Sequence, residues 1–211
     1  LENGVVTYYN IKNYNDKDEI TLTYLNNSRD TIVSFGNHFS GKQKLKVQKG
    51  ANKFSWNMYH DGATDFEGMI LWWASLSGPK AVPGEYYVDL NVNGKVISKT
   101  FNILIDPRSE SSISDMKEQF NFISAINETV DKAHKSIKKL RNIKAQLSKF
   151  VNEYSKNDIN ELIDKASMLE QKLSEIEKEL YQTQNRSGQD PLNFPIRLTN
   201  KLAHLNSLVS M

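Results

Sequence analysis

The sequence predicts an α+β protein made of two domains, an all-β sandwich over residues 1–108 and an antiparallel three-helix bundle over residues 109–211. Two observations predict this division. The chain has 211 residues, which exceeds the usual single-domain size of roughly 100–150 residues. Apolar residues also alternate with a period near two up to Ile105, and recur in steps of three and four after Arg108.

Seven runs in the first half alternate apolar and polar residues, as half-buried strands do. The runs are VVTYYNI, EITLTYL, TIVSF, KLKV, NKFSWNM, YYVDLNV and VISKTFNILI. About seven short strands at this spacing are typical of an immunoglobulin-like or fibronectin-III-like sandwich. Lysines alternate with Leu45 and Val47 around KLKV, so we expect a charged edge strand there rather than an anion site.

Turn residues separate several of these runs. Asn93-Gly94 joins the last two, and both residues tolerate the positive φ of the type I′ turn that closes a two-residue hairpin. Pro83-Gly84 combines a fixed φ with a permissive residue, which predicts a type II turn.

Three amphipathic stripes follow in the second half. The first runs from Ile113 to Val151, and a helix unbroken to Tyr154 would be roughly 60 Å long. Residues 155–158 predict a turn, and the second stripe covers residues 159–180. The third stripe consists of Leu198, Leu202, Leu205, Leu208 and Val209. A coiled-coil dimer could also explain the long first stripe, but the two further stripes can cover it within the chain, which favours the bundle.

The composition excludes several functional classes. Cysteine is absent, so disulfides and thiolate chemistry are excluded. The net charge of +2 is spread evenly, which argues against nucleic-acid binding, and no apolar run is long enough for membrane insertion. No phosphate-loop, nucleophile-elbow or helical zinc motif occurs, so we expect no cofactor, no metal and no catalytic residues. His134 and His204 are predicted to be exposed or capping residues.

One acidic loop, YHDGATDFEG, is the only polar cluster with catalytic potential. The loop contains three carboxylates, Asp61, Asp65 and Glu67, inside a span of seven residues. Carboxylates in a loop can bind calcium or form the acid and base pair of a glycoside hydrolase. The spacing does not fit a calcium-binding EF-hand, and an ordinary solvated loop is the favoured interpretation.

Aromatic residues of the first half are the remaining candidates for a contact site. Exposed rings can stack on sugar faces, whereas alternation along a strand sends one ring of each adjacent pair into the core. The candidates for contact with a ligand or with another domain are Tyr59, Phe66, Trp72 and Trp73.

A long motif then indicates a family. The segment from Gly50 to Arg108 resembles the C-terminal region of bacterial sortilin-like proteins, which are often labelled glycosyl hydrolases with Asp-box (BNR) repeats. The closing segment NFPIRLTNKLAHLNSLV also looks like the closing helix of that family. The matching positions are Asn52, Phe54, Trp56, Tyr59, Gly68, Trp72, Gly78, Pro79, Ala81, Pro83, Gly84, Tyr86, Val88, Leu90, Val92, Gly94, Lys95, Asp106, Pro107 and Arg108.

The resemblance implies a partner and a compartment. In such proteins a large β-propeller precedes this region in the same polypeptide, and any hydrolase activity belongs to the propeller. The present chain contains no Asp-box, SxDxGxTW. The resemblance therefore implies a non-catalytic C-terminal accessory region of an exported protein, periplasmic, secreted or on the cell surface. It would pack on the upstream propeller or make protein or glycan contacts.

Two alternatives remain open. The first is a carbohydrate-binding module that uses exposed aromatic residues, and the second, less favoured, is a glycoside hydrolase that uses the acidic loop.

The apolar run EGMILWW is expected to be covered on both sides. Alternation would place Met69, Leu71 and Trp73 on one face of an extended segment, and Ile70 and Trp72 on the other. We expect the sandwich core to cover one face and the helical domain or the propeller to cover the other.

Overall fold

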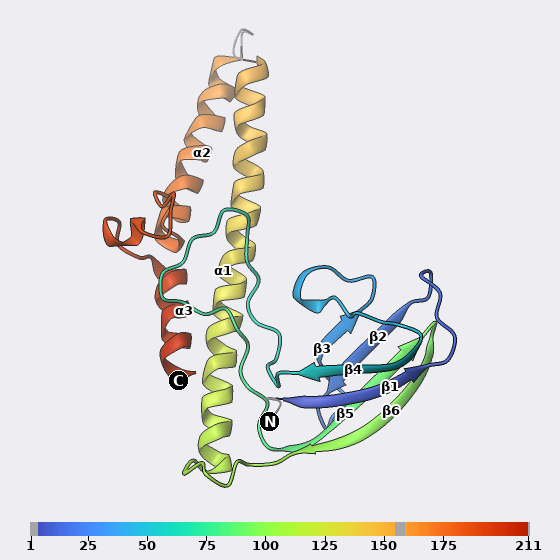
Figure 1. The fold of residues 1–211 in the computed structure, drawn as a ribbon. Coiled ribbons are helices and arrows are strands. Elements are labelled where there is room, and N and C mark those ends of the chain that lie inside the picture. The colour runs from blue at the N-terminus through green and yellow to red at the C-terminus, as the bar shows by residue number, and fades with distance from the viewer. Residues whose placement is uncertain (1–3, 155–158, 211) are drawn as a thin grey trace. The chain divides into compact units, whose positions relative to one another are not determined.

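The computed structural model of the protein describes residues 4–154 and 159–210. Within these residues it confirms an α+β protein with two antiparallel sheets and a helical C-terminal part (Figure 1). The strands are β1 (Val5–Ile11), β2 (Ile20–Leu25), β3 (Thr31–Gly36), β4 (Gly50–Trp56), β5 (Gly84–Val92) and β6 (Lys95–Ile103). The helices are α1 (Ile113–Tyr154), α2 (Asn160–Leu180) and α3 (Leu198–Val209). The turn predicted at residues 155–158 lies outside the described part.

The chain forms two compact units. One consists of the residues up to Asp61 together with Gly78–Asn121, and the other of Gly62–Ser77 together with the residues from Phe122 on. This division differs from the predicted domain boundary at residues 108/109 in two places. The start of α1 groups with the strands, and Gly62–Ser77 groups with the helices. We call the two the strand unit and the helical unit.

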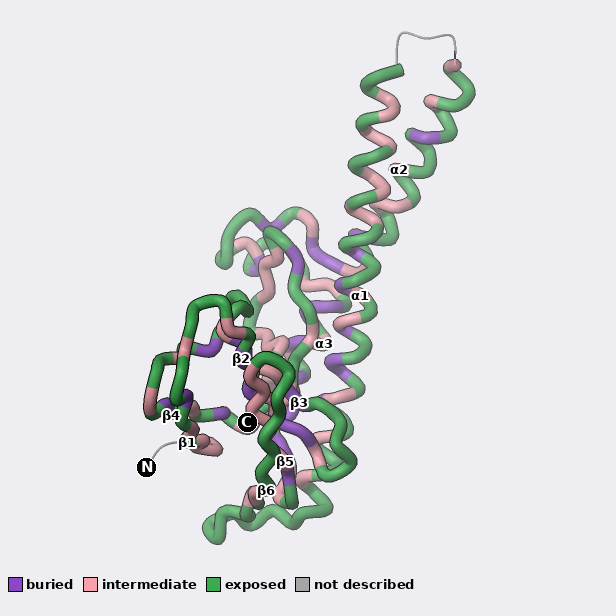
Figure 2. Tube along the Cα trace, turned by 90° about the vertical axis from the view of Figure 1, so that its right-hand side faces the viewer, coloured by how far each residue is buried: buried purple, intermediate pink, exposed green. Residues whose placement is uncertain are grey.

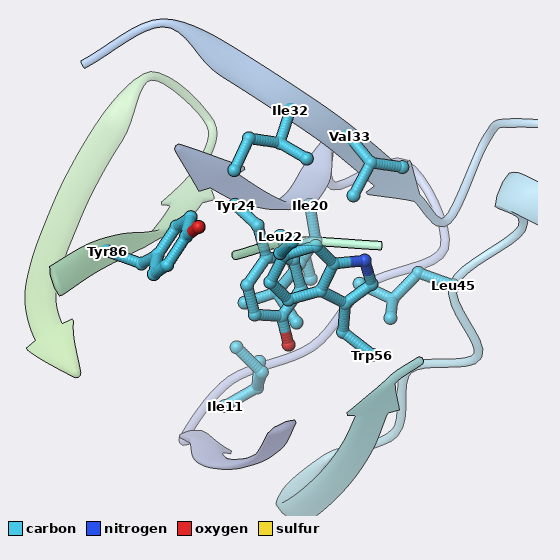
Figure 3. Close-up of a cluster of buried hydrophobic side chains, with 10 residues drawn as sticks. Ile11, Ile20, Leu22, Tyr24, Ile32, Val33, Leu45, Trp56 and Tyr86 are labelled. Carbon is cyan, nitrogen blue, oxygen red and sulfur yellow. The ribbon is translucent and has the colours of Figure 1, made fainter. Parts of the chain in front are cut away.

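The strand unit contains a two-stranded sheet, β1-β4, and a four-stranded sheet in the order β3-β2-β5-β6. Side chains from both sheets meet in one core (Figure 3). The rings of Tyr24 and Trp56, both fully buried, stack with their centroids 4.6 Å apart. Tyr24 pairs with Val33 on one side and with Val88 on the other, so β2 is an interior strand of its sheet.

The predicted strand at KLKV is wrong. Only an isolated bridge between Lys44 and Gly36 forms there. Leu45 is buried, but the side chain of Asn52 binds both backbone groups of Gln48, accepting from its N–H at 2.9 Å and donating to its C=O at 2.8 Å. That side chain therefore occupies backbone groups that a strand ladder would use.

The two predicted turns have different outcomes. Asn93 and Gly94 both have positive φ, 51° and 85°, and connect β5 to β6 directly, which confirms the I′-type hairpin. Gly84 lacks positive φ and begins β5, so the predicted type II turn is wrong.

The helices match the predicted stripes in extent but not in the face that α3 buries. α1 is continuous from Ile113 to Tyr154, and its buried residues all lie between Ile123 and Ile137 (Figure 2). The leucine stripe of α3 was predicted to be the buried face of this helix in a bundle, but a different face of α3 is buried. The buried residues of α3 are Thr199, Asn200, Ala203 and Asn206, whereas Leu198, Leu205 and Leu208 are exposed.

Candidate functional site

The segment Gly62–Ser77, which contains EGMILWW, forms neither a helix nor a strand. The expected strand-like alternation is therefore wrong. Its backbone is bound by groups of the helical unit instead of a neighbouring strand. The N–H of Ser75 donates to the C=O of Ala203 at 3.0 Å, and the N–H of Ile70 donates to the hydroxyl of Tyr181 at 2.7 Å. We call this stretch the strap.

Trp72 and Trp73 are fixed by two side chains of α3. The Asn200 amide binds Trp72 on both sides, accepting from its N–H at 2.8 Å and donating to its C=O at 2.9 Å. The Nδ1 of His204 donates to the C=O of Trp73 at 2.6 Å. Trp73 has a φ of 45°, a left-handed conformation that costs a non-glycine residue about 1–2 kcal/mol. These contacts hold the chain in that conformation.

The rings of Trp72, Trp73 and His204 form a short row, which we call the aromatic ledge. The two indoles lie 6.0 Å apart at an angle of 19°, and the ring of His204 lies 6.5 Å from Trp73 at 20°. Trp73 is 75% exposed and Trp72 is 39% exposed. A planar apolar surface is thus presented to solvent on a backbone that two side chains of α3 bind.

The exposed side of α3 adjoins this ledge. Leu208 lies one turn after His204, whose ring stacks on Trp73. Leu198, Leu205 and Leu208 are exposed by 45%, 37% and 53%. We call these three leucines together with Trp72 and Trp73 the contact face. Several exposed large apolar side chains on one helix and on the segment that it binds indicate an interaction site.

The opposite side of α3 is polar and buried. Asn206 is fully buried, and its Nδ2 lies 2.9 Å from the C=O of Ser77, 3.2 Å from that of Ser75 and 3.2 Å from Oδ1 of Asn127. Asn127 donates to the same C=O of Ser77 at 2.8 Å. The strap lacks a strand partner, so these amides satisfy its backbone carbonyls, which explains why α3 turns its polar side inward.

An aromatic and ionic cluster holds the middle of the strap. Phe66 is buried in a small core with Ile137 and Tyr181. The guanidinium of Arg141 lies 4.7 Å from the centroid of the Phe66 ring and donates to Glu177 at 2.7 Å. Arg141 therefore connects the strap, α1 and α2.

Glu177 is buried between two cations. Lys144 donates to its second carboxylate oxygen at 3.0 Å, opposite the bond from Arg141. Burial acts to raise the pKa of Glu177, but the hydrogen bonds from Arg141 and Lys144 outweigh it, and the pKa lies below its ordinary value. The carboxylate is held in its charged form.

The start of the strap is bound to α1 through His134. The prediction that His134 is exposed or capping is wrong, because its side chain is fully buried. Its Nδ1 donates to the C=O of Thr64 at 2.5 Å, and its Nε2 is buried without a hydrogen-bond partner. Burial lowers the pKa of His134, which outweighs the opposing effects of the Thr64 carbonyl and of Asp131.

The candidate contact residues fall in different environments. Tyr59 lies in the strand unit and is 37% exposed, and its C=O accepts from the indole of Trp56 at 3.0 Å. Phe66 is a core residue of the helical unit. Trp72 and Trp73 are brought together with His204, which the aromatic pattern did not include.

The acidic loop is divided between the two units. Asp61 belongs to the strand unit, where it accepts from Gln43 at 3.2 Å, and burial raises its pKa. Asp65 and Glu67 belong to the helical unit. Among the described residues, no group of three or more His, Asp or Glu side chains is arranged to hold a metal ion.

Sequence reasoning missed the polar residues that hold the strap. A signal was present for Asn127 and His134, because each occupies a position on the apolar stripe of α1, between Ile123 and Ile137. A polar residue on such a stripe indicates a buried hydrogen bond. No comparable signal marks Asn200 or Asn206, since they lie off the leucine stripe of α3.

No helix among the described residues is long and apolar enough to span a bilayer.

Comparisons with known proteins identify no relative. No protein-family model, curated protein or solved structure matches the chain at a significant level.

Proposed function

We propose that the chain is a non-catalytic accessory region that contacts another part of a larger exported protein through the contact face. The observation that carries this proposal is the inverted helix α3, which buries asparagines, exposes leucines and binds the exposed Trp73 through His204. Exposing large apolar side chains is unfavourable unless a partner covers them.

The partner proposed for this face is a β-propeller that precedes the chain in the same polypeptide. The resemblance of Gly50–Arg108 and of the closing helix to sortilin-like Asp-box proteins supports this partner. The same resemblance supports export to the periplasm, the cell surface or the medium. An aromatic and leucine surface of this kind is suited to burial against a folded domain, where Trp is enriched among the residues that dominate binding energy.

The proposed architecture of the strand unit is an immunoglobulin-like or fibronectin-III-like sandwich. Its antiparallel sheets share one core, and the hydroxyl of Tyr86 donates to the C=O of Val82 at 2.6 Å. A tyrosine bonded to backbone a few residues upstream resembles the tyrosine corner of such sandwiches. For the helical unit, the ion pairs between α1 and α2 and the bond between Asn206 and Asn127 support an antiparallel three-helix arrangement.

The first test is the coding sequence upstream of Leu1, where Asp-box repeats are expected. The second is calorimetric titration of the chain with the separately produced upstream region. The double variant Leu205→Lys/Leu208→Lys should abolish binding. A matched control, Leu162→Lys/Leu169→Lys, changes two leucines of α2 that are 52% and 45% exposed and should leave binding unchanged. Equal binding by both variants would refute the contact face, and upstream sequence without Asp-boxes would refute the propeller.

A second candidate function is carbohydrate binding by the aromatic ledge. The near-parallel rings of Trp72, Trp73 and His204 favour it, since a flat aromatic row with a polar edge suits the face and hydroxyls of a sugar ring. A glycan array probed with the wild type and with Trp73→Ala tests it. Ligands bound only by the wild type would support this candidate, and an array without ligands would exclude it.

A further inference from the structure

Among the titratable side chains of α1 that bind the strap is His134, which the proposed function does not use. His134 is fully buried, and one of its two ring nitrogens is bonded to Thr64. The other, Nε2, has no hydrogen-bond partner. A neutral imidazole suits this environment better than a charged one, because a buried acceptor nitrogen without a donor costs less free energy than a buried cationic N–H without an acceptor.

A protonated imidazole does not suit it. Both ring nitrogens then carry hydrogens, and the second N–H would be buried without an acceptor. The imidazole ring packs edge-to-face with the ring of Phe66, at a centroid distance of 5.1 Å and an angle of 90°, and a phenyl ring offers no lone pair. Proton uptake therefore requires the ring to reach water.

The charged groups around the ring do not remove this requirement. On α1, Asp131 lies one turn before His134 and Lys138 one turn after it, with opposite effects on the ring charge. Asp131 is already bonded to Lys135 and to both the N–H and the hydroxyl of Thr64. From the strap, Asp65 contributes the smallest of these effects. Directly after α2, the ring of Tyr181 packs edge-on against Phe66, at a centroid distance of 4.9 Å.

The strap, and not α1, is the element that can change its conformation when the ring reaches water. α1 is held by a continuous helical hydrogen-bond ladder over Ile113–Tyr154, whereas Gly62–Ser77 has no ladder of its own. We propose that His134 is an acid-sensitive latch, which holds the strap on α1 when the imidazole is neutral and releases it when the imidazole takes up a proton. The inference concerns the attachment of the strap and does not depend on which partner the contact face binds.

The pH dependence of strap opening follows from the pKa of the His134 imidazole in the opened and in the closed strap. In the opened strap the imidazole has an ordinary pKa near 6.5, and in the closed strap burial keeps its pKa lower. The opened state thus binds more protons below about pH 6.5, and opening becomes easier as the pH falls. One proton gives at most a tenfold change per pH unit, until the lower pKa of the closed state is reached.

Hydrogen exchange of the strap amides, corrected for intrinsic rates, tests the latch. The amide of Thr64, whose C=O His134 binds and whose N–H donates to Asp131 of α1, should lose protection by roughly tenfold between pH 7.0 and 5.5 in the wild type. His134→Asn keeps a donor near the position of Nδ1 but cannot titrate there, so its protection should not change over this range. His204→Asn is the matched control, because it removes the other histidine that binds the strap, and its pH dependence should persist.

Two results would overturn the latch. One is the same pH dependence in His134→Asn as in the wild type. The other is an imidazole resonance of His134 that titrates at pH 6.5 or above in the intact protein. The NMR titration needs no substitution, so it decides the question even where His134→Asn does not fold.

Discussion

The buried amide of Asn206 in α3 lies 3.2 Å from Oδ1 of Asn127 in α1. Both side chains also bind the C=O of Ser77, so one backbone carbonyl of the strap is shared by two helices. At this point α1, α3 and the strap are joined by hydrogen bonds between polar side chains and backbone. A polar bridge lies where the sequence pattern predicts leucine packing, and the leucines are left for solvent or a partner.

The first prediction is an inverted tolerance to substitution in α3. Asn206→Leu should lower the free energy of unfolding by about 3 kcal/mol, because it leaves buried carbonyls of the strap without donors. Leu208→Lys, two residues away on the exposed side, should change it by less than about 0.5 kcal/mol. Urea unfolding of both variants measures the difference. Equal destabilisation, or a larger loss for Leu208→Lys, would show that α3 is oriented differently.

A second prediction concerns the strained residue Trp73. Trp73→Gly should leave the free energy of unfolding unchanged or raise it by about 1 kcal/mol, because glycine adopts positive φ without the cost borne by tryptophan. Trp56→Ala, in the buried core, should instead destabilise the strand unit by about 3–5 kcal/mol. Thermal and urea unfolding of the two variants provide the comparison. A substantial loss of stability in Trp73→Gly would mean that the ledge serves packing rather than contact.

The ionic cluster predicts an acid-dependent loss of stability. Because the folded pKa of Glu177 is depressed, its contribution is present above the ordinary value of about 4.5 and is lost as the pH falls below it. Glu177→Gln should remove that part of the pH dependence. It should also destabilise the helical unit by about 3 kcal/mol at neutral pH, since Arg141 and Lys144 lose their partner. Unfolding free energies at pH 7 and pH 4 check both effects, and an unchanged acid slope in the variant would contradict them.

An alkaline transition is predicted for the strand unit. Burial raises the pKa of Tyr24 to about 12, despite the opposing hydrogen bond from Thr7. The neutral phenol is favoured in the folded state, so stability is present below pH 10 and is lost as the pH rises toward 12. The loss is on the order of 2 kcal/mol. Absorbance near 295 nm should show one tyrosine ionising last, and this late step should be absent in Tyr24→Phe.

Periodicity predicted the regular elements well and the strap poorly. Six of the seven alternating runs became strands, and the three stripes became helices close to their expected bounds. Such patterns are local, and the backbone of each element satisfies its own or a neighbouring ladder. The strap departs from this because its carbonyls are bound by side chains more than a hundred residues away in the sequence, at Asn200 and Asn206. No local period reports that kind of pairing.

The candidate site was partly predictable for the same reason. Trp72 and Trp73 are evident candidates in EGMILWW, but alternation predicted that they lie on opposite faces of a strand covered on both sides. His204 could not be linked to them, since its contact with Trp73 depends on how α3 meets the strap. The exposure of the α3 leucines could not be predicted either, because a leucine stripe normally marks the buried face of a helix.

Trp73 is proposed to lie at an interface with a propeller that precedes the chain in the same polypeptide. The most direct measurement replaces Trp73 by the photo-crosslinking residue p-benzoylphenylalanine, irradiates the full-length protein, and identifies the adducts by mass spectrometry. Ile97 of β6, which is 62% exposed, provides the control position. Such an interface predicts that position 73, and not position 97, links to propeller residues of the same polypeptide. No adduct at position 73, or equal yields at both positions, would contradict it.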